Sequence, residues 1–262
     1  MKIGFIGAGN MGGAIAKAVA AAGFGKDIII ADPCTEKALE LAGAVGGSIS
    51  TNETIAASCD YVFLGVKPQV MQSVLQTIFD CKGENTVFVS MAAGVTIDTI
   101  RKNLGENTKV IRIMPNTPVS VGSGMIVYAC SDNVISTEEE NFLQIMKKTG
   151  EVDKIPENLI DSACAVSGCG PAFVFMFAEA LANGGITCGL PKEKALQYAA
   201  QMIYGAADLL RQSDRTPAEL RDAVCSPGGS TIRGVMSLEE NGLYRTVEDA
   251  VIASYKRTIE LG

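Results

Sequence analysis

Three glycines near the amino terminus are spaced for contact with a phosphate group. An apolar run at Lys2–Ile6 leads directly into Gly-Ala-Gly-Asn-Met-Gly at residues 7–12, and a helical segment follows. In such a loop Gly7 permits a tight bend, Gly9 lets the backbone approach a pyrophosphate, and Gly12 allows close packing of helix on strand. The N–H groups and partial positive charge at the helix start attract phosphates. The pattern predicts a dinucleotide site.

An acidic residue follows the second expected strand. Asp32 comes after Asp27–Ala31 and about 20 residues beyond Gly12, where dinucleotide-binding βαβ units carry a carboxylate. There it would accept hydrogen bonds from the ribose hydroxyls and favour NAD, because it would repel a 2′-phosphate. Lys37, one turn later, is either a compensating cation or a solvated helix residue. Residues 3–32 are thus interpreted as a βαβ unit that binds a nicotinamide dinucleotide.

A second loop, Cys-Ser-Pro-Gly-Gly-Ser-Thr at residues 225–231, could hold an anion. Its two glycines permit positive φ, so that successive backbone N–H groups can converge. A helix expected from Ser230 adds its dipole, and Ser226 and Thr231 add hydroxyl donors. The segment fits either a pocket for a small carboxylate or an ordinary turn between helices capped by serine.

The chain contains no histidine, which bears on the reaction. Reduction of a ketone produces an alkoxide, and dehydrogenases usually supply a His, Tyr or Lys acid for it. A protonated C=N bond needs no such acid, because the iminium already carries the charge that hydride neutralises. Thr231 could hold that nitrogen by a hydrogen bond. The absence of histidine mildly favours an imine substrate over a carbonyl substrate. For a carbonyl substrate, Lys67 at the end of a strand is the possible proton source.

Alternating strands and helices must position the first loop. Such alternation predicts a mainly parallel sheet with helices on both faces. The expected strands are Lys2–Ile6, Asp27–Ala31, Tyr61–Val66, Thr86–Met91, Lys109–Met114 and Met125–Cys130. The expected helices are Gly12–Ala22, Thr35–Val45, Pro68–Phe79, Thr96–Leu104 and Thr137–Lys148, the last opened by a capping box of Ser136 and Glu139.

Only helical segments follow Ile155. They are Glu157–Val166, Pro171–Gly184, Pro191–Gln212, Pro217–Val224, Ser230–Glu240 and Thr246–Leu261. The second is apolar nearly all round and needs cover on more than one face, from a partner subunit or from a tight internal core. We expect an α/β chain with a Rossmann-like doubly wound sheet at residues 1–155, followed by an all-helical substrate-binding and dimerisation domain at 156–262.

Composition argues against other classes of protein. A hydrophobic content of 47% is typical of globular chains, and a net charge of −7 without basic clusters disfavours nucleic acid as a partner. The eight cysteines have no metal-ligand spacing, and most are interpreted as small core residues, so no metal is expected. Neither a signal peptide nor an uninterrupted membrane-length apolar run is visible, so we expect a cytoplasmic protein without a membrane partner.

Five motifs, in order along essentially the whole chain, resemble the Δ1-pyrroline-5-carboxylate reductase family. They are GAGNMGGAI (7–15), GVKP (65–68), MPNTP (114–118), SGCGPAF (167–173) and SPGGSTIRG (226–234), the last being the most specific. The resemblance implies NAD(P)H-dependent reduction of a small cyclic imino acid, 1-pyrroline-5-carboxylate, to L-proline, the final step of proline biosynthesis. It also implies a homodimer through the helical domain, with dimers assembling into decamers.

The resemblance also implies roles for individual residues. Thr231 is the expected catalytic residue, and the substrate would be held by Ser226, Gly229, Ser230 and Thr231. Together with the first loop, the expected cofactor-binding residues are Gly7, Ala8, Gly9, Asn10, Met11, Gly12, Asp32, Asn52, Val66, Lys67, Pro68, Ala92, Ala93, Gly94 and Asn116.

This chain departs from the family pattern at three positions. Cys169 stands where the family usually has serine, and Ser230 where threonine or alanine is common. Asp32 conflicts with the family's frequent use of NADPH, so NADP and NAD both stay open. Two other functions are considered. A β-hydroxyacid-dehydrogenase-like enzyme would need a lysine that the run after Gly170 lacks, and a non-catalytic dinucleotide sensor would leave the loop at 226–231 without a purpose.

Overall fold

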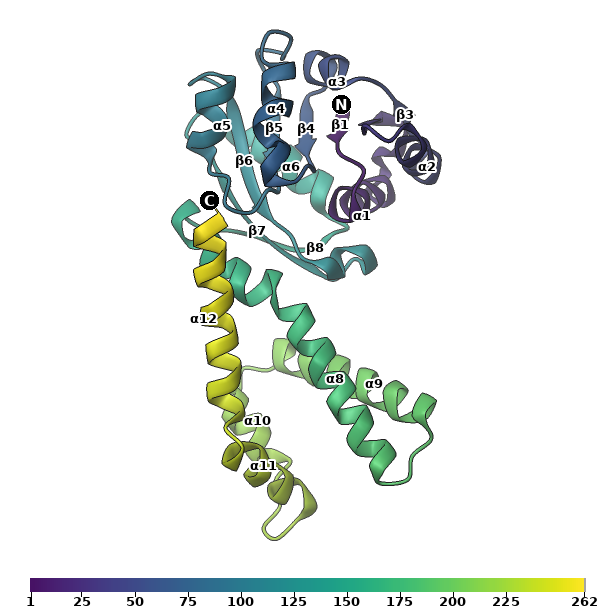
Figure 1. Ribbon diagram of the computed structural model, residues 1–262, viewed down its shortest axis with the longest axis vertical. Coiled ribbons are helices and arrows are strands. Elements are labelled where there is room, and N and C mark those ends of the chain that lie inside the picture. Colours follow the sequence, from purple (N-terminus) through teal and green to yellow (C-terminus); the bar gives the residue numbers. More distant parts are fainter. Residues whose placement is uncertain (262) are drawn as a thin grey trace. The chain divides into compact units, whose positions relative to one another are not determined.

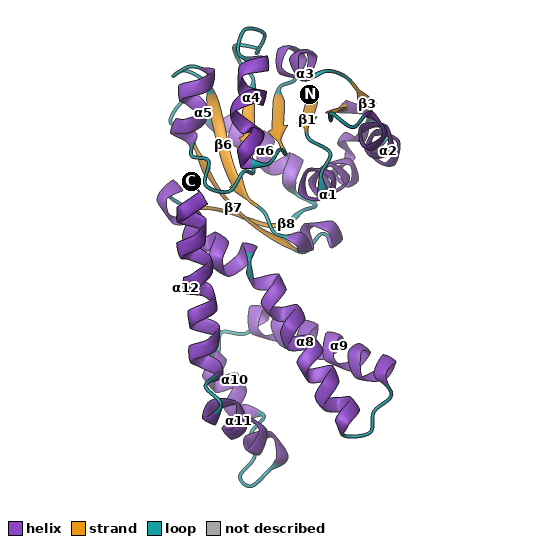
Figure 2. Cartoon of the chain, viewed as in Figure 1, coloured by secondary structure: helices purple, strands orange, loops and turns teal. Residues whose placement is uncertain are grey.

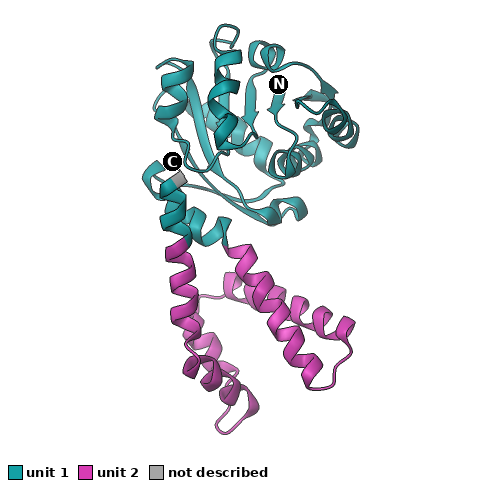
Figure 3. Ribbon diagram, in the orientation of Figure 1, with its two compact units in different colours: residues 1–169, 254–262 teal, residues 170–253 magenta. Residues whose placement is uncertain are grey.

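The computed structural model describes residues 1–261 and forms two compact units (Figures 1 and 3). The first comprises Met1–Cys169 together with the chain from Ser254 onward, and the second comprises Gly170–Ala253. The division at Cys169 lies after the expected domain boundary at residue 155. The intervening segment belongs to the first unit because Ile160 and Cys164 are buried in its core.

The first unit is built on an eight-stranded sheet with the order β3-β2-β1-β4-β5-β6-β7-β8 (Figure 2). The strands are β1 Ile3–Ile6, β2 Ile28–Ala31, β3 Ser48–Ile49, β4 Tyr61–Leu64, β5 Val87–Ser90, β6 Lys109–Met114, β7 Gly124–Cys130 and β8 Gly150–Lys154. All neighbours are parallel except β6 and β7. The direction of winding reverses at β1, and in open α/β sheets ligands bind beside such a reversal, at the carboxyl ends of the strands.

Helices cover both faces of this sheet. One core contains side chains from α1 (Asn10–Val19), α2 (Thr35–Val45) and α6 (Ser136–Met146). The other contains side chains from α3 (Asn52–Ser58), α4 (Pro68–Ile78), α5 (Ile97–Leu104) and α7 (Ile160–Ala163). Central strands such as β4 are buried along their whole length, as expected of a sheet covered on both sides. The predicted Rossmann-like fold is confirmed.

The expected capping box of Ser136 and Glu139 is wrong by one residue. Helix α6 begins at Ser136 with Ile135 as its N-cap, and the Ile135 N–H donates to Glu138 Oε2 over 3.1 Å. Glu139 is engaged elsewhere, since it accepts 2.7 Å hydrogen bonds from the Tyr128 hydroxyl and from Lys154 Nζ. Tertiary partners on β7 and β8 therefore take the side chain that local spacing assigned to the cap.

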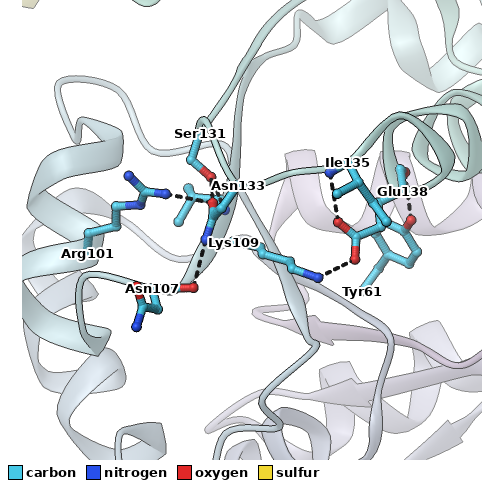
Figure 4. A network of polar contacts seen from close by, with 9 residues as sticks. Tyr61, Arg101, Asn107, Lys109, Ser131, Asn133, Ile135 and Glu138 are labelled. Carbon is cyan, nitrogen blue, oxygen red and sulfur yellow. Dashed lines mark hydrogen bonds and ion pairs between the residues drawn. The ribbon is translucent and has the colours of Figure 1, made fainter.

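A polar network fixes the connection that follows β7 (Figure 4). Asn133 Oδ1 accepts hydrogen bonds from Arg101 Nη2 at 2.6 Å and from the Ser131 hydroxyl at 2.7 Å. Asn133 Nδ2 donates to the Asn107 carbonyl at 2.7 Å. Nearby, Lys109 Nζ lies 2.5 Å from Glu138 Oε1. These contacts join α5, β6 and the start of α6 at the end of the sheet opposite to the predicted site.

The second unit consists of helices α8 (Gly170–Thr187), α9 (Lys192–Gln212), α10 (Pro217–Ala223), α11 (Ser230–Glu240) and the first part of α12 (Leu243–Leu261). Within residues 170–253 only three side chains are buried, and all are alanines: Ala182, Ala195 and Ala199. By length and composition alone, the run Glu157–Thr187 could also cross a membrane, and only 11% of its apolar window is buried. This unit has almost no core of its own.

A buried cation ties the segment after β8 to the sheet. Arg112, in the middle of β6, is 1% exposed, and its Nη2 lies 2.6 Å from Asp161 Oδ1. Its Nη1 lies 3.4 Å from Glu157 Oε1, which also accepts the Ile97 N–H at the start of α5. The expected helix Glu157–Val166 is instead a series of 3₁₀, α and π turns through Gly168. The ion cluster holds these turns against β6.

Replacing Arg112 with methionine should destabilise the protein by about 3 kcal/mol, because two carboxylates would lose their shared cation. Chemical denaturation at fixed protein concentration measures the change. Arg245→Met is the matched control, since Arg245 pairs with Asp249 on the surface and such exposed pairs contribute little. Equal stability of the two variants would show that the buried cluster is dispensable.

Candidate active site

The loop at residues 7–12 has the geometry that its glycines predict. Gly7 has φ of +104°, and a Cβ there would lie 2.7 Å from the Gly65 carbonyl oxygen. A Cβ on Gly12 would lie 2.5 Å from the Gly7 carbonyl oxygen, which no real side chain tolerates. Gly9, by contrast, faces open space, with no atom within 4 Å of an added Cβ. The loop is therefore closed toward the sheet and open where a ligand would approach.

The start of α1 is suited to an anion. Its N-cap is Gly9, so no side chain caps the first-turn N–H groups. A groove of about 860 Å³ runs from Gly9 and Asn10 along α1. Lys17, Lys37 and Lys148 also line it. The helix dipole fits the charge of a dinucleotide pyrophosphate, and of the expected cofactor residues Ala8, Gly9 and Asn10 line this groove.

The other cofactor residues expected in the first unit lie along the same edge of the sheet. Asp32 follows β2, Asn52 opens α3 after β3, residues 66–68 follow β4, residues 92–94 follow β5, and Asn116 follows β6. Because all these strands are parallel, their carboxyl ends share one edge, and the fold brings these segments to the same side as residues 7–12. Ala92 is buried, whereas Lys67 is exposed at the start of α4.

Two of these side chains bind protein groups. Asp32 Oδ2 accepts the Ala8 N–H at 2.8 Å, and Oδ1 accepts the Cys34 N–H at 2.9 Å. Asn116, 8% exposed, donates from Nδ2 to the Ser167 carbonyl and accepts the Met125 N–H, both at 2.9 Å. Asn116 thereby joins the end of β6 and the start of β7 to the Ser-Gly-Cys-Gly-Pro segment that begins at Ser167.

The predicted substrate residues lie in the second unit, where the loop at 225–231 leads into α11. Gly228 has φ of +72°, and the Gly229 N–H donates to the Ser226 carbonyl at 3.0 Å. Gly229 is the N-cap of α11 and makes no side-chain cap bond, so a helix–helix turn capped by serine is not what forms. A Cβ on Gly229 would collide with Ser226 Oγ.

The hydroxyl-bearing residues of this loop are open to ligands. Ser226, Ser230 and Thr231 are all exposed. The uncapped N–H groups of α11 lie beside them in the chain, so backbone and hydroxyl donors gather at one helix start. Such an arrangement can hold a carboxylate and leave a hydroxyl for a second polar atom of the same small molecule.

The sequence analysis did not identify the charged residues that pack beneath the carboxyl edge of the sheet in the first unit. Arg112 interrupts the apolar residues of β6 that follow Lys109, and Glu157 and Asp161 are spaced four residues apart. A lone charge in a buried strand signals a buried partner, and acids at that spacing can share one face of a turn. The Ser167 carbonyl carried no signal, because backbone partners are not visible in side-chain patterns.

Comparison with known proteins gives a consistent result. A family model described as pyrroline-5-carboxylate reductase dimerisation matches residues 157–261, and one described as NADP oxidoreductase, coenzyme F420-dependent, matches residues 2–94. Pyrroline-5-carboxylate reductase from Escherichia coli K12 is 37% identical, with 99% of this chain and 98% of that protein covered. Human pyrroline-5-carboxylate reductase 2 is 40% identical, with 100% and 84% covered.

A solved structure is similar over the same length. The crystal structure of Plasmodium falciparum pyrroline carboxylate reductase with NADP bound aligns with a TM-score of 0.92 at 33% identity, covering 100% of this chain and 98% of that one. Both the sheet unit and the helical unit thus have full-length counterparts in proteins of one kind.

Replacing Gly12 with alanine should weaken dinucleotide binding at least tenfold, because the new Cβ forces the Gly7 carbonyl and the loop apart. Titration of NADPH and NADH, followed by nicotinamide fluorescence, measures the dissociation constants. Gly43→Ala is the matched control, since Gly43 lies within α2 with open space around its Cβ position. That variant should keep its affinity and gain about 0.5–1 kcal/mol of stability. Unchanged affinity in Gly12→Ala would place the dinucleotide elsewhere.

Proposed function

The chain belongs to the pyrroline-5-carboxylate reductase family, and from that premise we propose how its residues divide the work of the reaction. The protein is an oxidoreductase that reduces 1-pyrroline-5-carboxylate to L-proline with NAD(P)H. The observation that carries this function is 37% identity to a named reductase over an alignment that covers 99% of this chain. When bound, the dinucleotide supplies the hydride.

We assign dinucleotide binding to the carboxyl edge of the sheet. The first-turn N–H groups of α1 would hold the pyrophosphate, with Gly9 giving the backbone room to approach. Asn52 would lie toward the adenosine end, and residues 66–68 and 92–94 would line the cleft. Asn116 would support the nicotinamide end as a brace, since its amide already binds Ser167 and Met125.

We assign substrate binding to Ser226, Gly229, Ser230 and Thr231. The uncapped N–H groups at the start of α11 would hold the substrate carboxylate together with the two serine hydroxyls. Thr231 Oγ1 would accept the N–H of the protonated ring nitrogen and fix the face of the C=N bond. No enzyme acid is needed in this step, because hydride addition to an iminium leaves a neutral amine. This accounts for a reductase without histidine.

We propose that the active form is a homodimer built through the helical unit. Large apolar side chains are exposed on α8, with Phe175 at 66% and Met176 at 70%, and on α9, with Tyr204 at 67%. A unit that buries only three alanines needs a partner to cover such surfaces, and a second copy fits because the dimerisation model spans 157–261. We also propose a functional division at residues 155 and 156, which follows the start of the dimerisation model at residue 157 and differs from the boundary of the compact units at Cys169. Decamers of dimers and a cytoplasmic location complete the proposal and rest on the family resemblance.

Purified protein should oxidise NADPH or NADH when 1-pyrroline-5-carboxylate is added. Thr231→Ala should lower kcat about tenfold to a thousandfold with little change in dinucleotide affinity, because the variant loses the contact to the reacting nitrogen. Steady-state absorbance at 340 nm measures turnover, and fluorescence titration measures binding.

Thr231→Ser is the conservative control and should keep most of the activity, since it retains the hydroxyl. No turnover by the wild-type protein with either dinucleotide would contradict the assigned reaction. A Thr231→Ala variant that loses dinucleotide binding but responds normally to substrate would contradict the role given to this loop.

Met176→Arg should convert the dimer to a monomer, because a guanidinium would be buried in an apolar interface. Size-exclusion chromatography with light scattering gives the mass directly. Leu39→Arg is the matched control, since Leu39 is a 54% exposed apolar residue on α2 of the first unit. A monomeric wild-type protein, or recovery of the wild type with membranes, would contradict the proposed use of α8.

A further inference from the structure

Asp32 stands where a carboxylate commonly contacts the adenosine ribose, yet its hydrogen bonds point to a different task. We propose that Asp32 is a positioning residue that fixes the loop at 7–12 for either dinucleotide, and that it does not select NADH over NADPH. The proposal rests on the proposed dinucleotide function of that loop. In this proposal Asp32 maintains the shape of the binding site and has no part in the choice between NADH and NADPH.

The first argument is the hydrogen-bond ladder between β1 and β2. These parallel strands are in register through Ile6 and Ala31. The Gly7 N–H then donates to the Ala31 carbonyl at 2.8 Å. The next N–H, that of Ala8, donates to Asp32 Oδ2 at 2.8 Å. The Asp32 side chain thus adds one hydrogen bond between the two segments just beyond the sheet, at the point where the chain turns toward α1.

The second oxygen is engaged as well. Asp32 Oδ1 accepts the Cys34 N–H at 2.9 Å and closes the turn through Pro33 that leads into α2. One carboxylate therefore joins the loop before α1 to the turn before α2. Hydrogen bonds to an ionised acceptor are about twice as strong as neutral ones, so release of either amide to a ribose hydroxyl would forfeit a strong contact.

The groove beside the loop supports the same assignment. Its lining includes Gly9, Asn10 and the cationic Lys37. The Asp32 carboxylate is turned into the loop, and its charge is shared between two amide donors. Glu40 is the acid that lines the groove, and three lysines line it as well. The groove beside the loop therefore carries more cations than anions.

The test begins with the ligand-free wild-type protein. Single-residue hydrogen–deuterium exchange, read by mass spectrometry with electron-transfer fragmentation, should show a protected Ala8 amide. In Asp32→Asn the amide NH₂ cannot serve both donors, so Ala8 should exchange at least tenfold faster. The dissociation constants of NADH and NADPH should rise by the same factor, about tenfold, and their ratio should stay within about threefold of wild type.

Glu36→Gln is the matched control, because it removes one negative charge from the first turn of α2 without a hydrogen bond to the loop. Ala8 protection should be unchanged in this variant. Two results would overturn the proposal: an Ala8 amide that exchanges rapidly in the wild type, or a shift of at least tenfold toward NADPH in Asp32→Asn. If Asp32→Asn does not fold, the wild-type exchange measurement still tests the hydrogen bond to Ala8, and Asp32→Ser takes its place in the titrations of NADH and NADPH. Neither readout involves pyrroline-5-carboxylate, so failure of the assigned reaction would be seen separately.

Discussion

The backbone crossing of Gly7, Gly12 and Gly65 is the constraint on which the binding edge depends. A Cβ on Gly65 would lie 3.0 Å from the Gly7 carbonyl oxygen, and a Cβ on either of the other two would come closer still to a carbonyl. Only glycine lets β1, its loop, α1 and β4 meet at such distances. The contact sets the direction in which α1 leaves the sheet, and with it the place where the uncapped N–H groups point.

Local patterns were sufficient for much of the fold. The bounds of β6, α2 and α11 agree with the sequence-based expectations, because each is a run of one periodicity between clear start and stop signals. β8 was missed because its sequence, Gly-Glu-Val-Asp-Lys, is charged and lies at the sheet edge, where it is bound on one side only. Helix α3 was missed because it is short and its start is marked only by Thr51, whose Oγ1 accepts the Thr54 N–H.

The sequence predicted where the residues of the candidate site lie, but not which groups they hydrogen-bond. Glycine spacing and strand ends placed the expected cofactor residues on one edge of the sheet, since parallel strands share their carboxyl side. The hydrogen bonds of Asp32 and Asn116 could not be read in this way. Their partners are backbone groups of Ala8, Cys34, Met125 and Ser167, and a main-chain N–H or carbonyl leaves no mark in the sequence. A motif therefore identifies the position of a carboxylate, whereas the N–H groups around it determine whether it binds the protein backbone or a ligand.

The two units differ in how they obtain stability, and this difference bears on catalysis. The first unit buries large side chains on both faces of its sheet, so its dinucleotide edge is supported within one chain. The second buries only alanines at Ala182, Ala195 and Ala199, although it carries the loop assigned to the substrate. A second copy that covered α8 and α9 would stabilise the unit that also carries α11 and its uncapped start. Assembly proposed through the helical unit would then stabilise the same unit that positions the loop at 225–231.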